Sequence, residues 1–244
     1  MEIRICKNSL ELGKSAAKYA AASINSAIAE NGVARIALST GASQFDTLAA
    51  LIKEDVDWSK VEMFHLDEYV DLPESHVASF RKYLKEKFTT KVNLKAAHFV
   101  EGTEENRKAL CKKISEAPID VGLIGIGENA HIAFNDPPAD FDTEEPYIVV
   151  NLNDTCKQQQ VGEGWFDTVD DVPKQAVSMS VKQIMKCKKI ITCVPYAVKA
   201  DAIFKTLSGE LSNQTPATML KTHKDFTLYI DNDSAAKISI PIVW

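Results

Sequence analysis

An almost unbroken apolar run, IDVGLIGIG at residues 119–127, constrains the fold of this 244-residue chain more than any other feature. Such a run is typical of a strand that is buried on both faces, and strands of that kind belong to parallel sheets covered by helices. The run leads directly into the loop ENAHIAFND, so the same strand also marks a candidate site.

The rest of the chain alternates between helix-like and strand-like segments. Residues 11–32 place Leu12, Ala16 and Ile24 on one face, and the following Gly32 predicts the end of that helix. Other helices are expected at 45–52, 79–88, 103–117 and from 199 to Gly209, and other strands at 34–40, 61–70, 97–100, 147–153, 188–195 and 226–232. We predict an α/β fold of three layers, with a mostly parallel twisted sheet between helices on both faces. This modified Rossmann-like arrangement is expected to form a single domain over residues 1–244.

Composition excludes several classes of function. The net charge is -6 with acidic and basic residues interspersed, which argues against a nucleic-acid partner. Neither a long apolar run nor an apolar signal core is present, so we expect no membrane partner and a cytoplasmic location. The five cysteines form no C-x-x-C pair, and no metal-binding motif such as H-E-x-x-H occurs. We therefore expect reduced thiols, no cofactor and no metal, and the sequence leaves homo-oligomerisation open.

Ligands of open parallel sheets bind beyond the carboxyl ends of the strands. The first such end reads STGASQF, where Ser39, Thr40 and Ser43 supply small hydroxyls and Gly41 permits a tight turn at Ala42. A helix expected directly afterwards would offer free N–H groups to an anion. The competing interpretation is an ordinary turn with Ser43 as the helix N-cap.

Three further strand ends carry groups suited to catalysis. Adjacent acids in an extended segment point in opposite directions, so only one of Asp67 and Glu68 is expected to face a cleft. Gly125 lets the backbone approach a ligand closely, and His131 follows it in the same loop. Lys199 lies near the start of a helix, where a bound anion would offset its charge. Taken singly, each has a plain structural explanation; together they indicate proton transfer on a small phosphorylated molecule.

On these motifs the sequence resembles the glucosamine-6-phosphate deaminase/isomerase family, whose superfamily also includes the 6-phosphogluconolactonases. The matching stretches are STGAS, FHLDEYVDLPESHVASFRKYL, GIGENAHIAFNDP, VPKQAVSMSV and KADAIFKTLSG, within residues 36–220. The resemblance implies that Asp67 moves a proton between C2 and C1 of the open-chain sugar and that His131 assists opening of the ring. It also implies that residues 40–43 and Lys199 bind the phosphate.

Two departures from the family pattern stand out. The family's usual loop reads D-G-H-I-A-F-N-E. In this chain Asn129 stands in place of the first acid, and Asp136, one methylene shorter, stands in place of the second. An amide can orient an imidazole but cannot stabilise its charge, so we expect an altered pH profile or sugar preference. The phosphate arginine of well-known deaminases has no counterpart, because Gly164 and Trp165 occupy that neighbourhood.

The expected function is deamination and isomerisation of glucosamine 6-phosphate or galactosamine 6-phosphate, giving the ketose 6-phosphate and ammonia. The small-molecule partner is then a sugar phosphate, and Asn129, His131, Asp136 and Asp67 are the candidate catalytic residues. Two alternatives stay open. One is a 6-phosphogluconolactonase-type hydrolase, and the other is a non-catalytic sugar-phosphate sensor, which the loss of the acid at Asn129 would suit.

Overall fold

The computed structural model describes residues 1–238; the last six residues of the predicted 1–244 domain lie outside the described residues. The main sheet consists of β1 (Glu2–Cys6), β2 (Ala34–Leu38), β3 (Val61–His65), β5 (Ala96–His98), β6 (Val121–Ile124), β9 (Lys189–Val194) and β10 (Phe226–Asp231). Its order is β1-β10-β9-β6-β2-β3-β5, and all neighbouring strands are parallel. The apolar run forms the central strand β6, so the prediction of a parallel sheet is confirmed.

Seven α-helices accompany the strands of the described chain. They are α1 (Ser9–Asn31), α2 (Phe45–Leu51), α3 (Phe80–Leu84), α4 (Glu104–Ile114), α5 (Asp154–Gly162), α6 (Val181–Met185) and α7 (Ala200–Ser208). The predicted helix ends are observed: Gly32 closes α1 with a left-handed φ of 73°, and Gly209 follows α7. The Thr103 side chain accepts a hydrogen bond from the N–H of Asn106 and caps α4, at the first residue of the helix predicted over 103–117.

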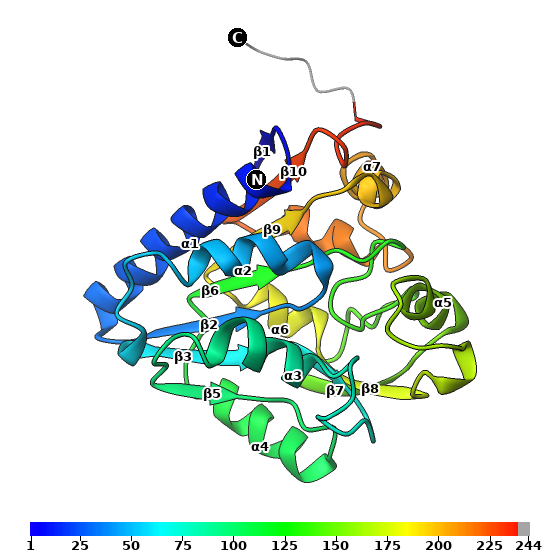
Figure 1. Cartoon of the computed structure of the whole chain (residues 1–244), viewed down its shortest axis with the longest axis horizontal. Helices are drawn as coiled ribbons and strands as arrows, with labels where there is room; N and C mark the ends of the chain where they lie inside the picture. The colour runs from blue at the N-terminus through cyan, green and yellow to red at the C-terminus, as the bar shows by residue number, and fades with distance from the viewer. Residues whose placement is uncertain (239–244) are drawn as a thin grey trace.

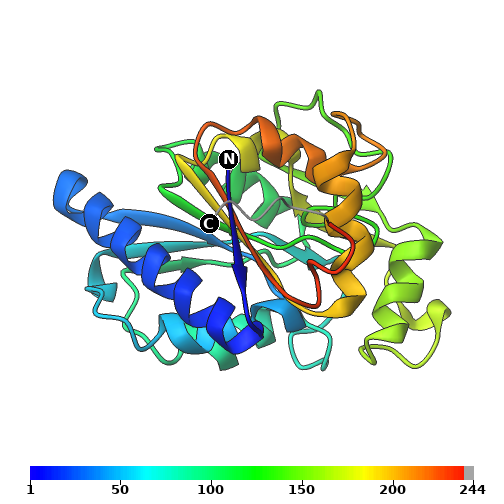
Figure 2. The same ribbon diagram turned by 90° about the horizontal axis from the view of Figure 1, so that it is seen from above.

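Helices cover both faces of the main sheet, which confirms the three predicted layers (Figures 1 and 2). On one face, α1 and α2 pack against the strands through buried residues such as Leu12 and Leu48. On the other face, α4, α6 and α7 contribute Leu110, Ile184 and Ile203 to a second core. α5 lies apart from both layers, at the end of the molecule opposite α1 (Figures 1 and 2).

A second, antiparallel sheet contains β4 (Asp67–Tyr69), β8 (Gln175–Met179) and β7 (Tyr147–Asn151), in that order. The prediction of one strand over 61–70 is therefore wrong. The Leu66 N–H donates to the carbonyl of Leu38 in the main sheet (3.3 Å), whereas the Leu66 carbonyl accepts from the N–H of Met179 in the second sheet (2.8 Å). The chain changes sheets at this one residue because its next strand partner is β8.

Several elements escaped prediction. β1 is a short edge strand that carries two charged residues, and α5 has the mostly polar sequence DTCKQQQVG. All five cysteines are free, and four of them are buried. No helix within residues 1–238 combines the length and the apolar character needed to cross a membrane.

Candidate functional site

A cavity of about 170 Å³ lies at the carboxyl edge of the main sheet, where the loops after β2, β6 and β9 meet. Nine of the eleven candidate residues line it: Ser39, Thr40, Gly41, Ala42, Ser43, Asp67, Gly125, His131 and Lys199. The remaining two, Asn129 and Asp136, do not line this cavity but contact the His131 side chain. Within residues 1–238, no group of three or more His, Cys, Asp or Glu side chains is arranged to hold a metal ion.

Residues 39–43, here called the anion loop, connect β2 to a short 3-10 turn. Gly41 adopts φ 99°, in a region that favours glycine. The Ser39 N–H donates to the carbonyl of Leu123 (2.9 Å), which aligns the loop with the end of β6. Across the described chain, the N–H groups of Gly41, Ala42 and Ser43 donate to no other residue, so they are available to an anion.

The interpretation of Ser43 as a helix N-cap is wrong. Ser43 lies inside the 3-10 turn Ala42–Gln44, and α2 begins directly after it without a side-chain cap. The Ser43 hydroxyl instead accepts a hydrogen bond from Nε2 of Gln44 (3.0 Å), which also donates to the carbonyl of Cys193 (3.1 Å). Gln44 thereby ties the anion loop to β9.

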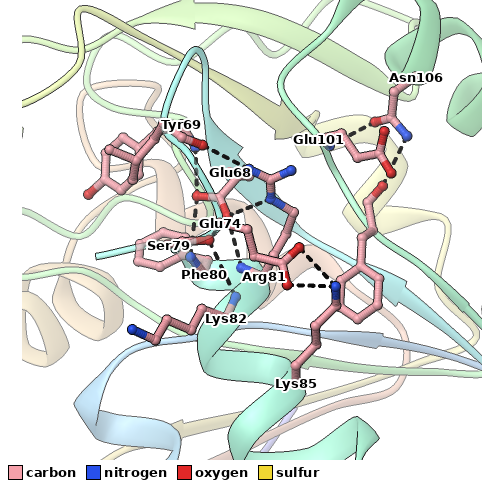
Figure 3. Close-up of polar contacts among 12 residues, drawn as sticks. Glu68, Tyr69, Glu74, Ser79, Phe80, Arg81, Lys82, Lys85, Glu101 and Asn106 are labelled. Carbon is pink, nitrogen blue, oxygen red and sulfur yellow. Dashed lines mark hydrogen bonds and ion pairs between the residues drawn. The ribbon is translucent and has the colours of Figure 1, made fainter. Parts of the chain in front are cut away.

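The two adjacent acids of β4 point in opposite directions. Asp67 lines the cavity with only 6% of its surface exposed, and burial, followed by the charge of Glu68, raises its pKa to about 8. Glu68 points toward the start of α3 and is fully buried (Figure 3). It accepts hydrogen bonds from the Ser79 hydroxyl (2.8 Å) and from the Arg81 N–H (2.8 Å), and pairs with the Arg81 guanidinium at 3.3 Å. Glu68 thus fixes the strand from which Asp67 faces the cavity.

The His131 ring is held by both residues that depart from the family pattern. Its Nδ1 lies 2.6 Å from Oδ1 of Asn129 and 3.1 Å from Oδ1 of Asp136. The Asn129 amide is oriented because its Nδ2 donates to Asp136 (3.0 Å) while its Oδ1 accepts the His131 N–H (3.1 Å). Both partners of Nδ1 are acceptors, so Nδ1 carries the proton and Nε2 is left as an acceptor.

Asp136 is the carboxylate that contacts the imidazole, with its Oδ1 3.1 Å from Nδ1 of His131. Burial alone would raise the pKa of Asp136, but the hydrogen bonds and charge of His131, together with Asn129, hold it below its ordinary value. Asp136 therefore stays ionised and keeps the charge that the loop needs. The family's first acid, two residues before the histidine, is replaced here by the neutral amide of Asn129, which still orients the ring.

The backbone of the histidine loop is unusually tight. Ala130 and Ala133 flank His131 with φ values of 65° and 49°, which L-residues other than Asn and Asp rarely adopt. A Cβ built on Gly127 would come within 3.0 Å of three His131 ring atoms, so only glycine fits beneath the ring. The Gly127 N–H also donates to the His131 carbonyl (2.9 Å).

Asn135 connects this loop to the second sheet. Its side-chain amide, 3% exposed, donates to the carbonyls of Ile132 (2.8 Å) and Met179 (2.9 Å). The neighbouring Ser178 pairs with Asp67 across β4 and β8, and its hydroxyl accepts the N–H of Phe134 (3.0 Å). The end of β8 therefore positions both Asp67 and the histidine loop, a role that the sequence did not reveal.

Lys199 is buried at the start of α7 with 7% of its surface exposed. Burial lowers the pKa of its ammonium group, and the charges of Glu163 and Glu128 oppose this effect. Its ammonium group makes no hydrogen bond or ion pair with any residue in 1–238. A buried cation at a helix N-terminus is costly without an anion, so the arrangement favours an anionic ligand.

The α5 segment, residues 154–165, forms a wall of the cavity that was not predicted. Gln159, Gln160, Glu163 and Trp165 line it. The Glu163 carboxylate accepts hydrogen bonds from Nε2 of Gln159 (2.7 Å) and Nε1 of Trp165 (3.0 Å). Asn153, which caps α5, was the available signal in an otherwise polar stretch. No arginine is among the described residues that line the cavity.

A parallel α/β sheet with an anion loop, a buried carboxyl group of raised pKa and an oriented histidine defines an acid–base site for a small anionic molecule. The family model described as "Glucosamine-6-phosphate isomerases/6-phosphogluconolactonase" matches residues 7–229, and the chain belongs to this family. The resemblance of the sequence motifs to this family is confirmed.

Individual relatives agree over nearly the whole chain. A glucosamine-6-phosphate deaminase of Staphylococcus epidermidis is 37% identical over 230 residues, which is 89% of this chain and 93% of the relative. The one of Halothermothrix orenii is 34% identical, with 97% and 99% of the two chains covered. The solved structure of a monomeric glucosamine-6-phosphate deaminase superposes with a TM-score of 0.86 at 28% identity, covering 97% and 99%. A 6-phosphogluconolactonase of Trypanosoma brucei shares the fold, with a TM-score of 0.79 at 16% identity over 98% of each chain.

Proposed function

We propose that this chain is an amino-sugar-phosphate deaminase that converts glucosamine 6-phosphate, or its C4 epimer galactosamine 6-phosphate, to the ketose 6-phosphate and ammonia. The observation that carries the proposal is Asp67, a buried carboxyl group whose pKa is raised to about 8 in a cavity shared with His131 and the anion loop. The named relatives, at 34% and 37% identity, support the same reaction.

Ring opening is the first step of the proposed reaction. Because Nδ1 of His131 donates to Asn129 and Asp136, Nε2 can take the proton of the anomeric hydroxyl and pass it to the ring oxygen. Asp136 stabilises the imidazolium that forms in between. The open-chain sugar then presents an aldehyde at C1 and an amine at C2.

Asp67 performs the second step. Its carboxylate takes the proton from C2 while a proton of the C2 ammonium group passes to O1, which gives a neutral enolamine. The carboxylic acid of Asp67 then returns the first proton to C1. A group whose pKa lies near the working pH can both take and return a proton, and burial gives Asp67 this property. The product is an iminium ion at C2; water adds to it, ammonia leaves, and the ketose 6-phosphate remains.

The substrate is proposed to lie with its phosphate on the anion loop and beside Lys199. Free N–H groups of residues 41–43 and the buried ammonium group of Lys199 supply the donors. Carbons C1 and C2 would then lie toward Asp67. No cofactor or metal takes part in the proposed steps.

An ammonia-release screen over the 6-phosphates of glucosamine, galactosamine and mannosamine tests the proposal. Release from the first or second compound is expected. A parallel lactone-consumption assay distinguishes the lactonase alternative. Thermal stabilisation by all three sugar phosphates without turnover would instead favour the sensor, and the deaminase proposal would fail.

Replacing Lys199 with methionine is expected to raise KM for the amino-sugar phosphate by about 10–100-fold, the range for losing a charged hydrogen-bond partner. kcat should change less, because Lys199 does not contact the reacting carbons in the proposed geometry. Lys205→Met removes the same charge from the exposed face of α7 and is the matched control. Steady-state kinetics of the two variants test this. A wild-type KM in Lys199→Met would contradict the assignment of Lys199 as a phosphate-binding residue.

A further inference from the structure

Tyr196 adopts a backbone conformation that favours glycine, with φ 81° and ψ 143°. This lies outside the left-handed helical region that a few polar residues tolerate. Bulky residues persist in such conformations only where their surroundings hold them, and these residues cluster at ligand sites. Tyr196 also lines the cavity. The question is therefore why this position carries a tyrosine and not a glycine.

The contacts that hold this turn are made by the backbone of Tyr196. Its N–H donates to both carboxylate oxygens of Asp231 (3.1 and 3.2 Å), which is 1% exposed and accepts the N–H of Ser234 (2.8 Å). The Tyr196 carbonyl accepts the N–H of Lys199 (3.0 Å). A glycine would make every one of these bonds with less strain, so the turn requires the conformation but not the phenol.

Tyr196 and the anion loop line the same cavity. Burial and the charge of Asp46 raise the pKa of Tyr196, while the nearby Ser9 hydroxyl lowers it. The same phenol contributes to the raised pKa of Tyr83, whose hydroxyl donates to the carbonyl of Gly41 (3.2 Å). The Tyr196 hydroxyl therefore belongs to a small group of polar atoms around the anion loop.

The charged groups of the cavity wall do not satisfy all the hydrogen bonds that a bound phosphate can accept. A phosphate dianion would meet one cation, Lys199, and no arginine among the described residues of the cavity wall. Neutral donors must supply the remaining hydrogen bonds. Ser39 is one candidate, because its hydroxyl is buried in the wall and has no partner among residues 1–238. Tyr196 is another, because it carries a hydroxyl on a strained backbone that its fold does not require.

We propose that Tyr196 is a substrate-binding residue whose hydroxyl donates a hydrogen bond to the phosphate group, partly filling the place of the absent arginine. The identity of the ligand rests on the proposed function, but anion binding at Tyr196 does not require turnover. Strain at residue 196 then has a use: it keeps the phenol over the anion loop while Lys199 is held three residues later.

Calorimetric titration of the whole chain with inorganic phosphate and with glucitol 6-phosphate, an open-chain sugar phosphate without the amine, tests this proposal. Tyr196→Phe removes only the hydroxyl and is expected to weaken both ligands by about 10–100-fold, as for loss of one hydrogen bond to a charged group. Ser9→Ala removes the neighbouring hydroxyl and should leave both affinities unchanged. Wild-type affinity in Tyr196→Phe, or an equal loss in Ser9→Ala, would overturn the proposal.

Tyr196→Gly separates binding from folding. Because the backbone bonds remain and the strain is relieved, this variant should unfold at or above the wild-type temperature and still bind phosphate more weakly. Loss of both stability and affinity would assign the side chain to the fold and overturn the proposal. If the wild type binds glucitol 6-phosphate but releases no ammonia from any amino-sugar phosphate, the proposed function fails while the role of Tyr196 stands.

Discussion

Replacing Asp67 with asparagine is expected to abolish ammonia release and, at the same time, to stabilise the protein. Activity should fall by about 10³-fold or more, since a positioned acid–base group typically contributes 10²–10⁴-fold. The amide removes a carboxyl group that is buried and whose ionised form is further disfavoured by the charge of the adjacent Glu68. We expect the free energy of unfolding to rise by roughly 1–3 kcal/mol near pH 8, from the burial cost of an ionisable group.

The stabilisation should depend on pH in a defined direction. The Asp67 carboxyl loses its proton near its ordinary pKa of 3.8 in the unfolded chain, but only near pH 8 in the folded site. Between these values the folded state binds one more proton, so this group makes the wild type less stable as pH rises from about 4 to about 8. Asp67→Asn lacks this contribution, and its advantage in urea unfolding should be larger at pH 8 than at pH 5.

Asp71→Asn is the matched control, because it removes the same charge from an exposed position four residues later. It should keep the activity and the pH dependence of stability of the wild type. An inactive Asp67→Asn variant that is less stable than the wild type at pH 8 would show that the carboxyl group does not carry the burial cost inferred here.

Gly127→Ala is expected to lower kcat by about 10²-fold with little change in substrate binding, which is the lower end of the range for a lost acid–base group. The new Cβ would displace the His131 ring, and the ring cannot move without lengthening its bonds to Asn129 and Asp136. Ring opening, which depends on Nε2, should therefore slow. Glucitol 6-phosphate has no ring to open, so its affinity should stay close to that of the wild type.

Gly162→Ala serves as the control for this substitution, since a Cβ at that position of α5 meets no atom within 4 Å. Its kcat should equal that of the wild type. Equal kcat values in Gly127→Ala and the wild type would mean that the loop relaxes around the methyl group and that the ring position is not critical.

Local patterns predicted most of the main sheet correctly. The apolar run that contains β6 has no polar face, because both faces of this strand are buried under helices. The end of α1 and the start of α4 were predicted correctly. Gly32 caps α1 and Thr103 caps α4 through hydrogen bonds to residues within one helical turn. In each case the deciding interaction lies within a few residues in sequence.

The second sheet was missed because its pairing is distant in sequence. Asp67 lies opposite Ser178, and the extended pattern of 61–70 carries no sign of the change of partner at Leu66. The same distance hid Asn135 and β8 as supports of the site. α5 was missed for another reason: its polar sequence has little apolar periodicity, since part of its surface lines the cavity and Cys156 is its one buried apolar residue.

The sequence predicted those site residues that directly follow a strand of the parallel sheet. Asp67, His131 and Lys199 are brought together by the parallel sheet, as their positions after β3, β6 and β9 indicated. Ser43 was misjudged as a possible cap because a short 3-10 turn separates the anion loop from α2. Tyr196 gave no signal, since its strained conformation depends on Asp231, 35 residues later in the chain.

The elements that line the cavity differ in how tightly they are tied to the two sheets, and therefore in how freely they can vary in evolution. Asp67 follows a residue whose backbone is bonded on both sides, so an insertion or a shift there would disturb both sheets. α5 stands apart from the layers, and its Gln160 accepts a hydrogen bond from the Tyr69 hydroxyl (2.7 Å). Descendants of this chain could therefore acquire a new sugar preference through changes in α5 while inheriting the proton-transfer geometry unaltered.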